Sequence, residues 1–462
     1  MLDAWDIYLR STEGKPVSET EFDSMILPMR LMELAKEYDI SYNPDEIIPT
    51  DKDYIQSIYD AAVSLLVDVG YYNSSTGRII SFDEYEIKHN MRMQPGEFNA
   101  GQGADAVHVV NRKFEDERAP PIIGGPCGGP ITEDYYLKIM QSYAMEPSVS
   151  CVHTGTLLTV NGCEVKSKTT SEMMAARREI TMTREALRRA GRPGLSILGT
   201  MSGTGSEAQC FGYSPDGLRS NCDRLLVSLL NELKVDWDVL KKALFCQQNE
   251  LDVVNCMATV VGGYLGGPET TMIGLTAECI AGFLLLGGHS MNVTTPNDAI
   301  TADKSFAGSL YALAGANAAL TQNTNAIINQ YCSVSSGTGS EKAMIEIMAV
   351  GGAATASGAS AIVGPSTANT IKTNTYGGMD ARVLEGAINA FAGMGLEEAN
   401  EKVVALIKNY GGFDASNFKA APARPFEELY DQRTLRPTRE FEDLWKNTKV
   451  KITDMVGLEF AD

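Results

Sequence analysis

Between residues 105 and 375, short apolar segments alternate with longer helical segments. We predict eight strands, at Pro121–Gly124, Val149–Thr154, Leu195–Leu198, Arg224–Leu230, Val253–Val260, His289–Thr294, Asn325–Tyr331 and Ser360–Gly364. Helices are predicted between them, for example at Ser171–Ala190, Asp236–Gln247, Glu269–Leu285, Ser305–Leu320 and Ser340–Ala354. Eight strand–helix units over about 260 residues are what a closed parallel barrel requires. The alternation therefore predicts an α/β fold, the TIM (β/α)8 barrel.

Helical segments are predicted on both sides of this barrel. Residues 1–104 are amphipathic at helical spacing, as in Phe22–Tyr38 and Asp53–Val69, and we expect an N-terminal helical extension. Residues 376–462 are expected to form a C-terminal helical region packed on the barrel. Its predicted helices are Met379–Ala392, Leu396–Tyr410 and Arg439–Asp454.

Composition restricts the class of function. The formal net charge is −20 and no basic run occurs, which argues against nucleic acid as a partner. The nine cysteines form no C-x-x-C pair, so neither a disulfide framework nor a zinc ribbon is indicated. The longest apolar candidate, Ile280–Leu286, is far shorter than the roughly 18 residues of a membrane span, and the first residues lack an apolar signal region. We expect a cytoplasmic protein.

Two glycine-rich sequences each occur twice, four predicted strands apart. GGPCGGPITE follows the first strand and GGYLGGPETT the fifth, while SGTGSE follows both the third and the seventh strand. The two copies are separated by nearly the same number of residues in both cases. This favours two related half-barrels over chance clustering among the 43 glycines of the chain. Loops after the strands build the active site of such a barrel, so Gly203, Gly205, Gly337 and Gly339 are predicted to approach a cofactor there. The alternative is that these loops are tight turns followed by capped helices. The GTGSEA segment also matches a dinucleotide-binding motif, but no acidic residue stands at the distance that this motif requires.

Taken together, these segments resemble the corrinoid-dependent monomethylamine methyltransferases, the family whose barrel carries pyrrolysine. The resemblance spans nearly the whole chain. It rests on IPTDKD (48–53), GGPCGGPITED (124–134), GRPG (191–194), NELK (231–234), GGYLGGPETT (262–271), NQY (329–331) and MDAR (379–382).

The resemblance assigns site positions, and most of them differ from the family. Leu198 stands where the family has pyrrolysine, and Leu226 and Cys256 stand in place of its two active-site glutamates. In the NQY segment the family glutamine is matched to Gln330, and the tyrosine two residues on is matched to Cys332. With the electrophile and both acids absent, the resemblance implies a barrel retained for different methyl-donor chemistry.

The function implied is transfer of a methyl group from an N-methylated small molecule to the Co(I) of a separate corrinoid protein. This chain shows no D-x-H-x-x-G cobalamin motif, so the corrinoid belongs to the partner. A quaternary amine needs no imine capture, and its cation would be lined by Tyr331, Tyr213, Glu207 or Asp252. Asn292 and Thr294 are predicted polar liners of the same site. A homo-oligomer is expected.

Other interpretations of these residues stay open. Cys256 and Cys332 are expected to face the barrel mouth, where His153 would complete a thiolate-zinc site acting on an O- or S-methyl donor, although we expect no metal. Gln330 could equally satisfy backbone groups, and Glu207, following a serine, could simply cap its helix. A non-catalytic barrel that binds the corrinoid protein is the third possibility.

Overall fold

The computed structural model describes residues 2–460 and contains a closed ring of eight parallel strands. The ring order is β11-β12-β14-β16-β18-β19-β5-β7, which is the chain order closed on itself. The TIM barrel predicted from the alternation is therefore confirmed. Its strands are β5 (Ile122–Gly124), β7 (Val149–His153), β11 (Ser196–Gly199), β12 (Arg224–Ser228), β14 (Asp252–Met257), β16 (Ser290–Val293), β18 (Ile327–Ser333) and β19 (Ala361–Ser366).

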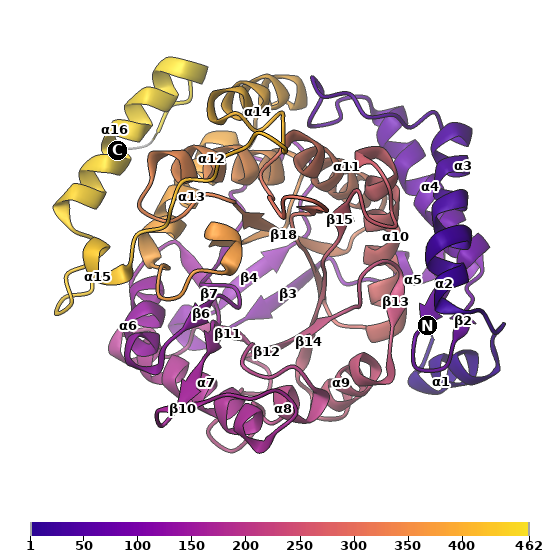
Figure 1. Ribbon diagram of the computed structural model, residues 1–462, viewed down its shortest axis with the longest axis horizontal. Helices are drawn as coiled ribbons and strands as arrows, with labels where there is room; N and C mark the ends of the chain where they lie inside the picture. Colours follow the sequence, from indigo (N-terminus) through magenta and orange to yellow (C-terminus); the bar gives the residue numbers. More distant parts are fainter. Residues whose placement is uncertain (1, 461–462) are drawn as a thin grey trace.

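Helices surround the strands on all sides (Figure 1). One helix follows each barrel strand, and three of them (α7, α9 and α12) begin after a Thr, Asp or Ser whose side chain accepts a backbone N–H of the first turn. These helices are α6 (Glu133–Ala144), α7 (Thr170–Arg189), α8 (Ser206–Cys210), α9 (Trp237–Gln248), α10 (Pro268–Leu286), α11 (Ala307–Asn323), α12 (Glu341–Ala356) and α13 (Gly378–Phe391).

Two barrel strands end earlier than predicted. β12 ends at Ser228 because the chain turns away from the ring, and Leu230 instead bridges Lys234. β14 ends at Met257, and Val260 pairs in a separate ladder with Asn297, between β15 (Val260–Val261) and β17 (Asn297–Asp298). Apolar residues that follow both strand ends, such as Leu229 and Val261, are buried in these loops. The apolar segment in the sequence is therefore longer than the strand, and the predicted strands were too long.

The N-terminal region is not purely helical. Its helices are α1 (Ala4–Glu13), α2 (Glu19–Glu21), the π-helix η1 (Phe22–Ile26), α3 (Leu27–Glu37), α4 (Lys52–Val69) and α5 (Glu84–Arg92). Between and after them lie β1 (Tyr71–Asn73), β2 (Arg78–Ile80) and β3 (Glu97–Ala100), which sequence periodicity missed because they are only three or four residues long. β1 joins the barrel region by pairing with β13 (Lys234–Val235), and α4 packs on α10 and α11.

A hairpin closes the N-terminal end of the barrel. β3 pairs antiparallel with β4 (Val107–Val110), and its Phe98 ring lies 4.9 Å from the guanidinium carbon of Arg224. The interior space beneath the hairpin is only about 10 Å³, while a separate cleft of about 580 Å³ lies beside it, between Phe98, Arg224 and His289. The interior itself is thus filled at this end, and the strands end at the opposite face, where active sites of TIM barrels are built.

The C-terminal helices cover one side of the ring, beside α12 (yellow in Figure 1). They are α14 (Leu396–Tyr410), α15 (Phe426–Leu429) and α16 (Arg439–Val456). The segment leading into α15 covers the loop after β18, since Gly337 N–H donates to Ala421 O at 2.9 Å. Gly339 is covered in turn by the side chain of Leu429. The second SGTGSE sequence is therefore not open to a ligand.

One helix has the length and composition of a membrane span. α10 has a mean hydropathy of 1.4, but 94% of that window is buried within the protein. It lies against α4 on one side and α11 on the other, so its apolar surface is accounted for by the barrel's own packing.

Gly337 offers a direct test of this cover. A Cβ at Gly337 would lie 2.2 Å from the Ala423 Cα, whereas a Cβ at Gly205 meets nothing closer than the Glu207 carboxylate at 3.5 Å. We expect Gly337→Ala to lower the free energy of unfolding by about 1–3 kcal/mol. Gly205→Ala should change it by less than about 0.5 kcal/mol. Denaturant titration measures both, and equal stabilities would contradict the cover over this loop.

Candidate active site

A compact cluster fills the barrel interior beneath the ends of the strands. Its members come from seven of the eight strands and are separate from the main core between strands and helices. They are Ile123, Cys151, Leu198, Leu226, Val254, Cys256, Tyr331, Ala361 and Val363, with Cys127 and Met201 packed against them from the loops after β5 and β11. The predicted residues Leu198, Leu226, Cys256 and Tyr331 are thus brought together.

Tyr331 and His153 form the polar centre of this cluster. The His153 Nδ1 atom lies 3.2 Å from the Thr154 carbonyl, which can only accept, so Nδ1 carries the proton. The Nε2 atom is then the acceptor for the Tyr331 hydroxyl, at 2.8 Å. Burial lowers the pKa of His153 to about 4, with a smaller lowering from the charge of Arg224. Burial also raises the pKa of Tyr331 well above its usual value, so both groups are neutral at physiological pH.

Cys256 and Asn292 extend this neutral cluster across two further strands. The Cys256 thiol is within hydrogen-bonding reach of Ser228 and Tyr331, yet burial raises its pKa to about 11. The Asn292 Oδ1 atom accepts from Asn329 Nδ2 at 2.9 Å, while its own buried Nδ2 atom lacks a protein acceptor. The site therefore offers neutral donors and acceptors and a thiol that stays protonated, rather than a charged acid or a thiolate nucleophile.

Gln330 and Cys332 do not belong to this site. Successive side chains of a strand point to opposite faces, and Tyr331 points inward, so both neighbours point outward. The Gln330 Nε2 atom donates to Leu313 O on α11 at 2.9 Å, and the Cys332 Sγ atom lies 3.8 Å from Ile347 O on α12. The prediction that both belong to the site is therefore wrong.

The same geometry corrects the zinc alternative. Its three ligands were Cys256, Cys332 and His153, but Cys332 lies on the other side of β18 from the other two. Within residues 2–460, no group of three His, Cys, Asp or Glu side chains is arranged to hold a metal.

The residues expected to line a cation are dispersed. The Tyr213 hydroxyl lies 2.8 Å from Ser220 Oγ, outside the barrel interior. Glu207 is exposed in the first turn of α8, with one carboxylate oxygen 3.8 Å from Lys241 Nζ. Asp252 begins β14 at the far end of the barrel and pairs with His289 at 2.6 Å. These three predictions are wrong, and of the proposed lining only Tyr331 lies in the interior.

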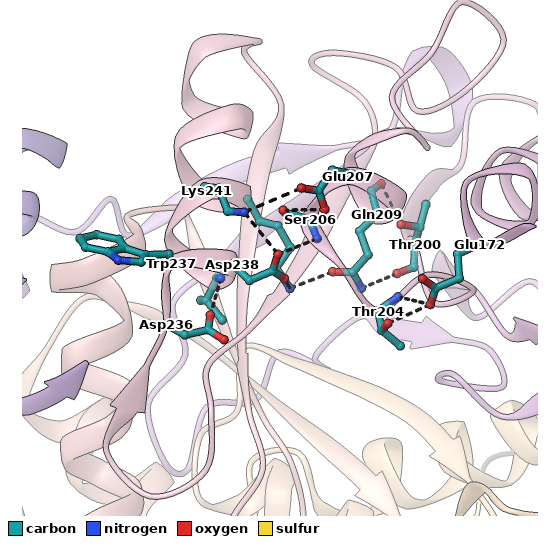
Figure 2. A network of polar contacts seen from close by, with 12 residues as sticks. Glu172, Thr200, Thr204, Ser206, Glu207, Gln209, Asp236, Trp237, Asp238 and Lys241 are labelled. Atoms are coloured by element: carbon teal, nitrogen blue, oxygen red, sulfur yellow. Dashed lines mark hydrogen bonds and ion pairs between the residues drawn. The ribbon is translucent and has the colours of Figure 1, made fainter. Parts of the chain in front are cut away.

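Side chains from the neighbouring helices occupy the glycine loop after β11 (Figure 2). Thr204 donates its backbone N–H and its hydroxyl to Glu172 Oε1, at 3.1 and 2.8 Å. The Ser206 N–H, at the start of α8, donates to Asp238 Oδ1 at 3.0 Å. The protein's own carboxylates therefore fill the Thr204 and Ser206 donors of this loop, while the approach of Gly203 and Gly205 to a cofactor stays a prediction.

Two buried glutamates hold the loops after β11 and β18. Glu179 of α7 accepts the backbone N–H groups of Met201 and Ser202, at 2.9 and 2.6 Å. Glu346 of α12 accepts those of Ser335 and Ser336, at 3.0 and 3.2 Å. The two SGTGSE loops are therefore supported in a similar way, although one carboxylate precedes its loop in the chain and the other follows it.

Two cations at the barrel interior were not anticipated from the sequence. Arg224 begins β12 and is buried at the closed end, where its Nε and Nη1 atoms have no hydrogen-bond partner. Lys304, in the loop after β16, is partly buried near Cys127. An arginine at the start of an apolar strand was a visible signal, but a lone lysine in a loop was not.

Comparison with known proteins agrees with this geometry over the full chain. Residues 2–458 match the family described as monomethylamine methyltransferase MtmB. The chain is 30% identical to MtmB2 of Methanosarcina acetivorans and to MtmB of Methanosarcina mazei, each over 459 residues, covering 99% of this chain and 98% of each relative. The crystal structure of MtmB from Methanosarcina barkeri superposes with a TM-score of 0.94 at 29% identity, covering 99% of both chains.

The chain belongs to the monomethylamine methyltransferase MtmB family. It is accordingly an enzyme of the corrinoid-dependent methyltransferase class, as the resemblance implied. On β18 the inward-facing polar residues are Asn329 and Tyr331, which contact Asn292 and His153.

The pKa of Glu179 predicts a pH-dependent stability in this member of the MtmB family. Burial raises its pKa from 4.5 to about 7, against hydrogen bonds from Ser202, Thr154 and Met201 that lower it. A group with a raised folded-state pKa stabilises the protein below its unfolded-state pKa, and this contribution is lost as the pH rises through about 7. The free energy of unfolding should therefore be higher for wild type than for Glu179→Gln, and this difference should be larger at pH about 5 than at pH about 8.

Glu185→Gln is the control on the same helix. Arg188 and Arg189 hold the pKa of this exposed carboxyl at about 2, so its charge does not change over that pH range. Urea denaturation at both pH values compares the variants. A difference for Glu179→Gln that does not depend on pH would contradict the assignment.

Proposed function

We propose that this enzyme moves a methyl group from an N-methylated small molecule to the Co(I) of a separate corrinoid protein. In this displacement the carbon–nitrogen bond breaks, its electron pair stays on nitrogen, and the carbon–cobalt bond forms with the electron pair of Co(I). The observation that carries the proposal is the full-length family match together with an inward-facing neutral cluster of Tyr331, His153 and Cys256 beneath the open end of the barrel.

The donor we propose has a fully substituted nitrogen. Leu198, buried in the interior cluster, offers no electrophile to capture a primary amine. The neutral His153 and Tyr331 offer no strong acid to protonate a leaving amine. A quaternary nitrogen departs as a neutral tertiary amine without protonation, which fits a site whose groups are uncharged.

The charge pattern also disfavours methylammonium. Asp252 is the one carboxylate on the described barrel strands, and it lies at the closed end paired with His289. No carboxylate of the barrel strands therefore lies beside Tyr331 to compensate a simple cation, which makes monomethylamine a poor match in spite of the relatives' name. A non-catalytic, corrinoid-protein-binding barrel stays the alternative.

A donor screen tests this function. Purified enzyme, reduced corrinoid protein and one donor are mixed anaerobically, and methyl–cobalt formation is read by absorbance. We expect transfer from a quaternary N-methyl donor and at least about tenfold slower transfer from monomethylamine. Comparable rates would overturn the donor class, and no transfer from any donor would favour the non-catalytic barrel.

A pair of cysteine variants locates the site in the same assay. Cys256 and Cys332 are both buried, but only Cys256 contacts Tyr331. We expect Cys256→Ala to slow transfer about tenfold or more, because the Tyr331 network loses a partner. Cys332→Ala should transfer at the parental rate. If Cys332→Ala were the slower variant, the interior site described above would be wrong.

The corrinoid protein is proposed to dock over the open end of the barrel. A corrinoid is too wide to enter a packed barrel, so the donor's methyl group has to meet it at the mouth. Loops after the strands expose apolar side chains on this side, namely Leu158 at 37%, Ile300 at 93% and Ile371 at 68%. The Ser336–Gly339 loop, which is covered by the chain itself, is left out of this docking face. The homo-oligomer stays a prediction.

Ile300→Asp tests the docking face. The Ile300 side chain is 93% exposed and contributes nothing to the core. We therefore expect unchanged stability and donor affinity, but a KM for the corrinoid protein that is raised about tenfold or more. Val450→Asp, on α16 and 62% exposed, is the matched control and should leave KM unchanged. A parental KM in Ile300→Asp would contradict docking over this loop.

A further inference from the structure

A cleft of about 580 Å³ lies at the closed end of the barrel, on the far side from the strand ends. It is bounded by the β3–β4 hairpin and the starts of β12, β14 and β16, and its lining includes Phe98, Arg224, Leu251, Asp252 and His289. Small-molecule sites usually measure about 300–1,000 Å³, so this cleft has the size of a binding site. The function proposed above does not use it, because the methyl group has to meet the corrinoid at the opposite end.

Arg224 brings an unpaired charge to the lining of this cleft. The residue is only 3% exposed, and its Nε and Nη1 atoms have no hydrogen-bond partner. Its Nη2 atom has only the Cys151 Sγ atom, at 3.7 Å. Within residues 2–460, no carboxylate forms an ion pair with this guanidinium. A buried guanidinium without an acceptor is costly, so the arrangement favours a bound anion.

The acids closest to Arg224 in the chain and in the sheet already have partners. Asp223, the preceding residue, accepts hydrogen bonds from Nε and Nη2 of Arg219, both at 2.7 Å. Asp252, opposite Arg224 in the ladder between β12 and β14, pairs with His289 at 2.6 Å. The guanidinium of Arg224 is therefore left without a counter-ion from its neighbours.

His289 supplies a second donor beside Arg224. Its Nδ1 atom is held by Asp252, and in the described part of the chain no protein atom is hydrogen-bonded to its Nε2 atom. The hydrogen bond to Asp252 raises the pKa of His289, although burial and the charge of Arg224 act in the opposite direction. The protonated ring then has a free Nε2–H. Phe98 adjoins both donors, since its ring lies 4.9 Å from Arg224 Cζ and 6.0 Å from the His289 ring.

We propose that this cleft binds a small organic acid whose single carboxylate lies between Arg224 and His289. The carboxylate supplies the acceptor that Arg224 lacks, through charge-assisted hydrogen bonds. One negative charge balances the one unpaired guanidinium, whereas the exposed Glu250 on the same lining disfavours a more highly charged anion. Leu251 and Val253 line the cleft beside the body of the acid. This site is separate from the interior cluster and does not depend on the identity of the methyl donor.

Matched acids and amides test the ligand class. The probes are acetate, butyrate and benzoate, each paired with the amide of the same carbon skeleton, in which a neutral group of similar shape replaces the carboxylate. Calorimetry at constant ionic strength measures binding to the purified protein, without corrinoid protein or methyl donor. We expect at least one acid to bind wild type about tenfold or more tightly than its amide.

Substitutions at the cleft test the two donors. Arg224→Met should abolish the preference for the acid, and His289→Gln should weaken binding of the acid about threefold or more without changing binding of the amide. Because His289 is half exposed, the second variant is expected to fold even if the first is unstable. His108→Gln is the matched control, since His108 is 53% exposed and pairs with Glu97 at 3.3 Å but does not line the cleft. A preference that survives in the folded cleft variants, or that is lost equally in His108→Gln, would overturn the proposal.

Further outcomes decide the ligand class and the place of binding. Equal binding of acid and amide to wild type would overturn the role of Arg224. Tighter binding of inorganic phosphate than of every acid would overturn the carboxylate class. A crystal soaked with para-bromobenzoate locates the acid by the anomalous signal of bromine. Bromine in the cleft beside Phe98 would support the proposal, and bromine only elsewhere would contradict it.

Discussion

The closed ring of parallel backbone hydrogen bonds is the constraint on which the rest of this enzyme depends. Once eight strands close, every second side chain must point inward, and a one-residue difference moves a side chain from the site to the helix layer. Tyr331 and Cys332 are neighbours in sequence, yet one meets His153 and the other meets α12. Strand register thus determines which side chains make up the site.

Closure also separates the two ends of the barrel. The β3–β4 hairpin fills the interior at the N-terminal end, with Phe98 stacked on Arg224. At the opposite end the loops are held by carboxylates from the surrounding helices, chiefly Glu179 and Glu346. These two buried acids accept backbone N–H groups, and the groups of the interior cluster itself, His153 and Tyr331, are neutral.

Much of the architecture was predictable from the sequence. All eight strands and the main helices lie where the alternation of apolar segments placed them, because each strand is a short, mostly apolar segment between helical segments. The short strands β1, β2 and β3 were missed because three or four residues carry too little periodicity. The site was predicted only in part. Leu198, Leu226, Cys256, Asn292 and Tyr331 lie in the interior, whereas Gln330 points outward, Glu207 is exposed, and Gly337 and Gly339 are covered by the C-terminal segment.

By itself the sequence determined the barrel and the family, since these depend on local pattern and on residue identity. Tertiary structure alone decided which side chains meet. The inward face of β18 depends on pairing with β16 and β19, and the cover over Gly337 depends on a segment more than eighty residues later in the chain. The hydrogen bond from the Lys304 N–H to Ser335 Oγ joins loops that follow two different strands. Such contacts are set by closure of the whole chain in space, and no local pattern encodes them.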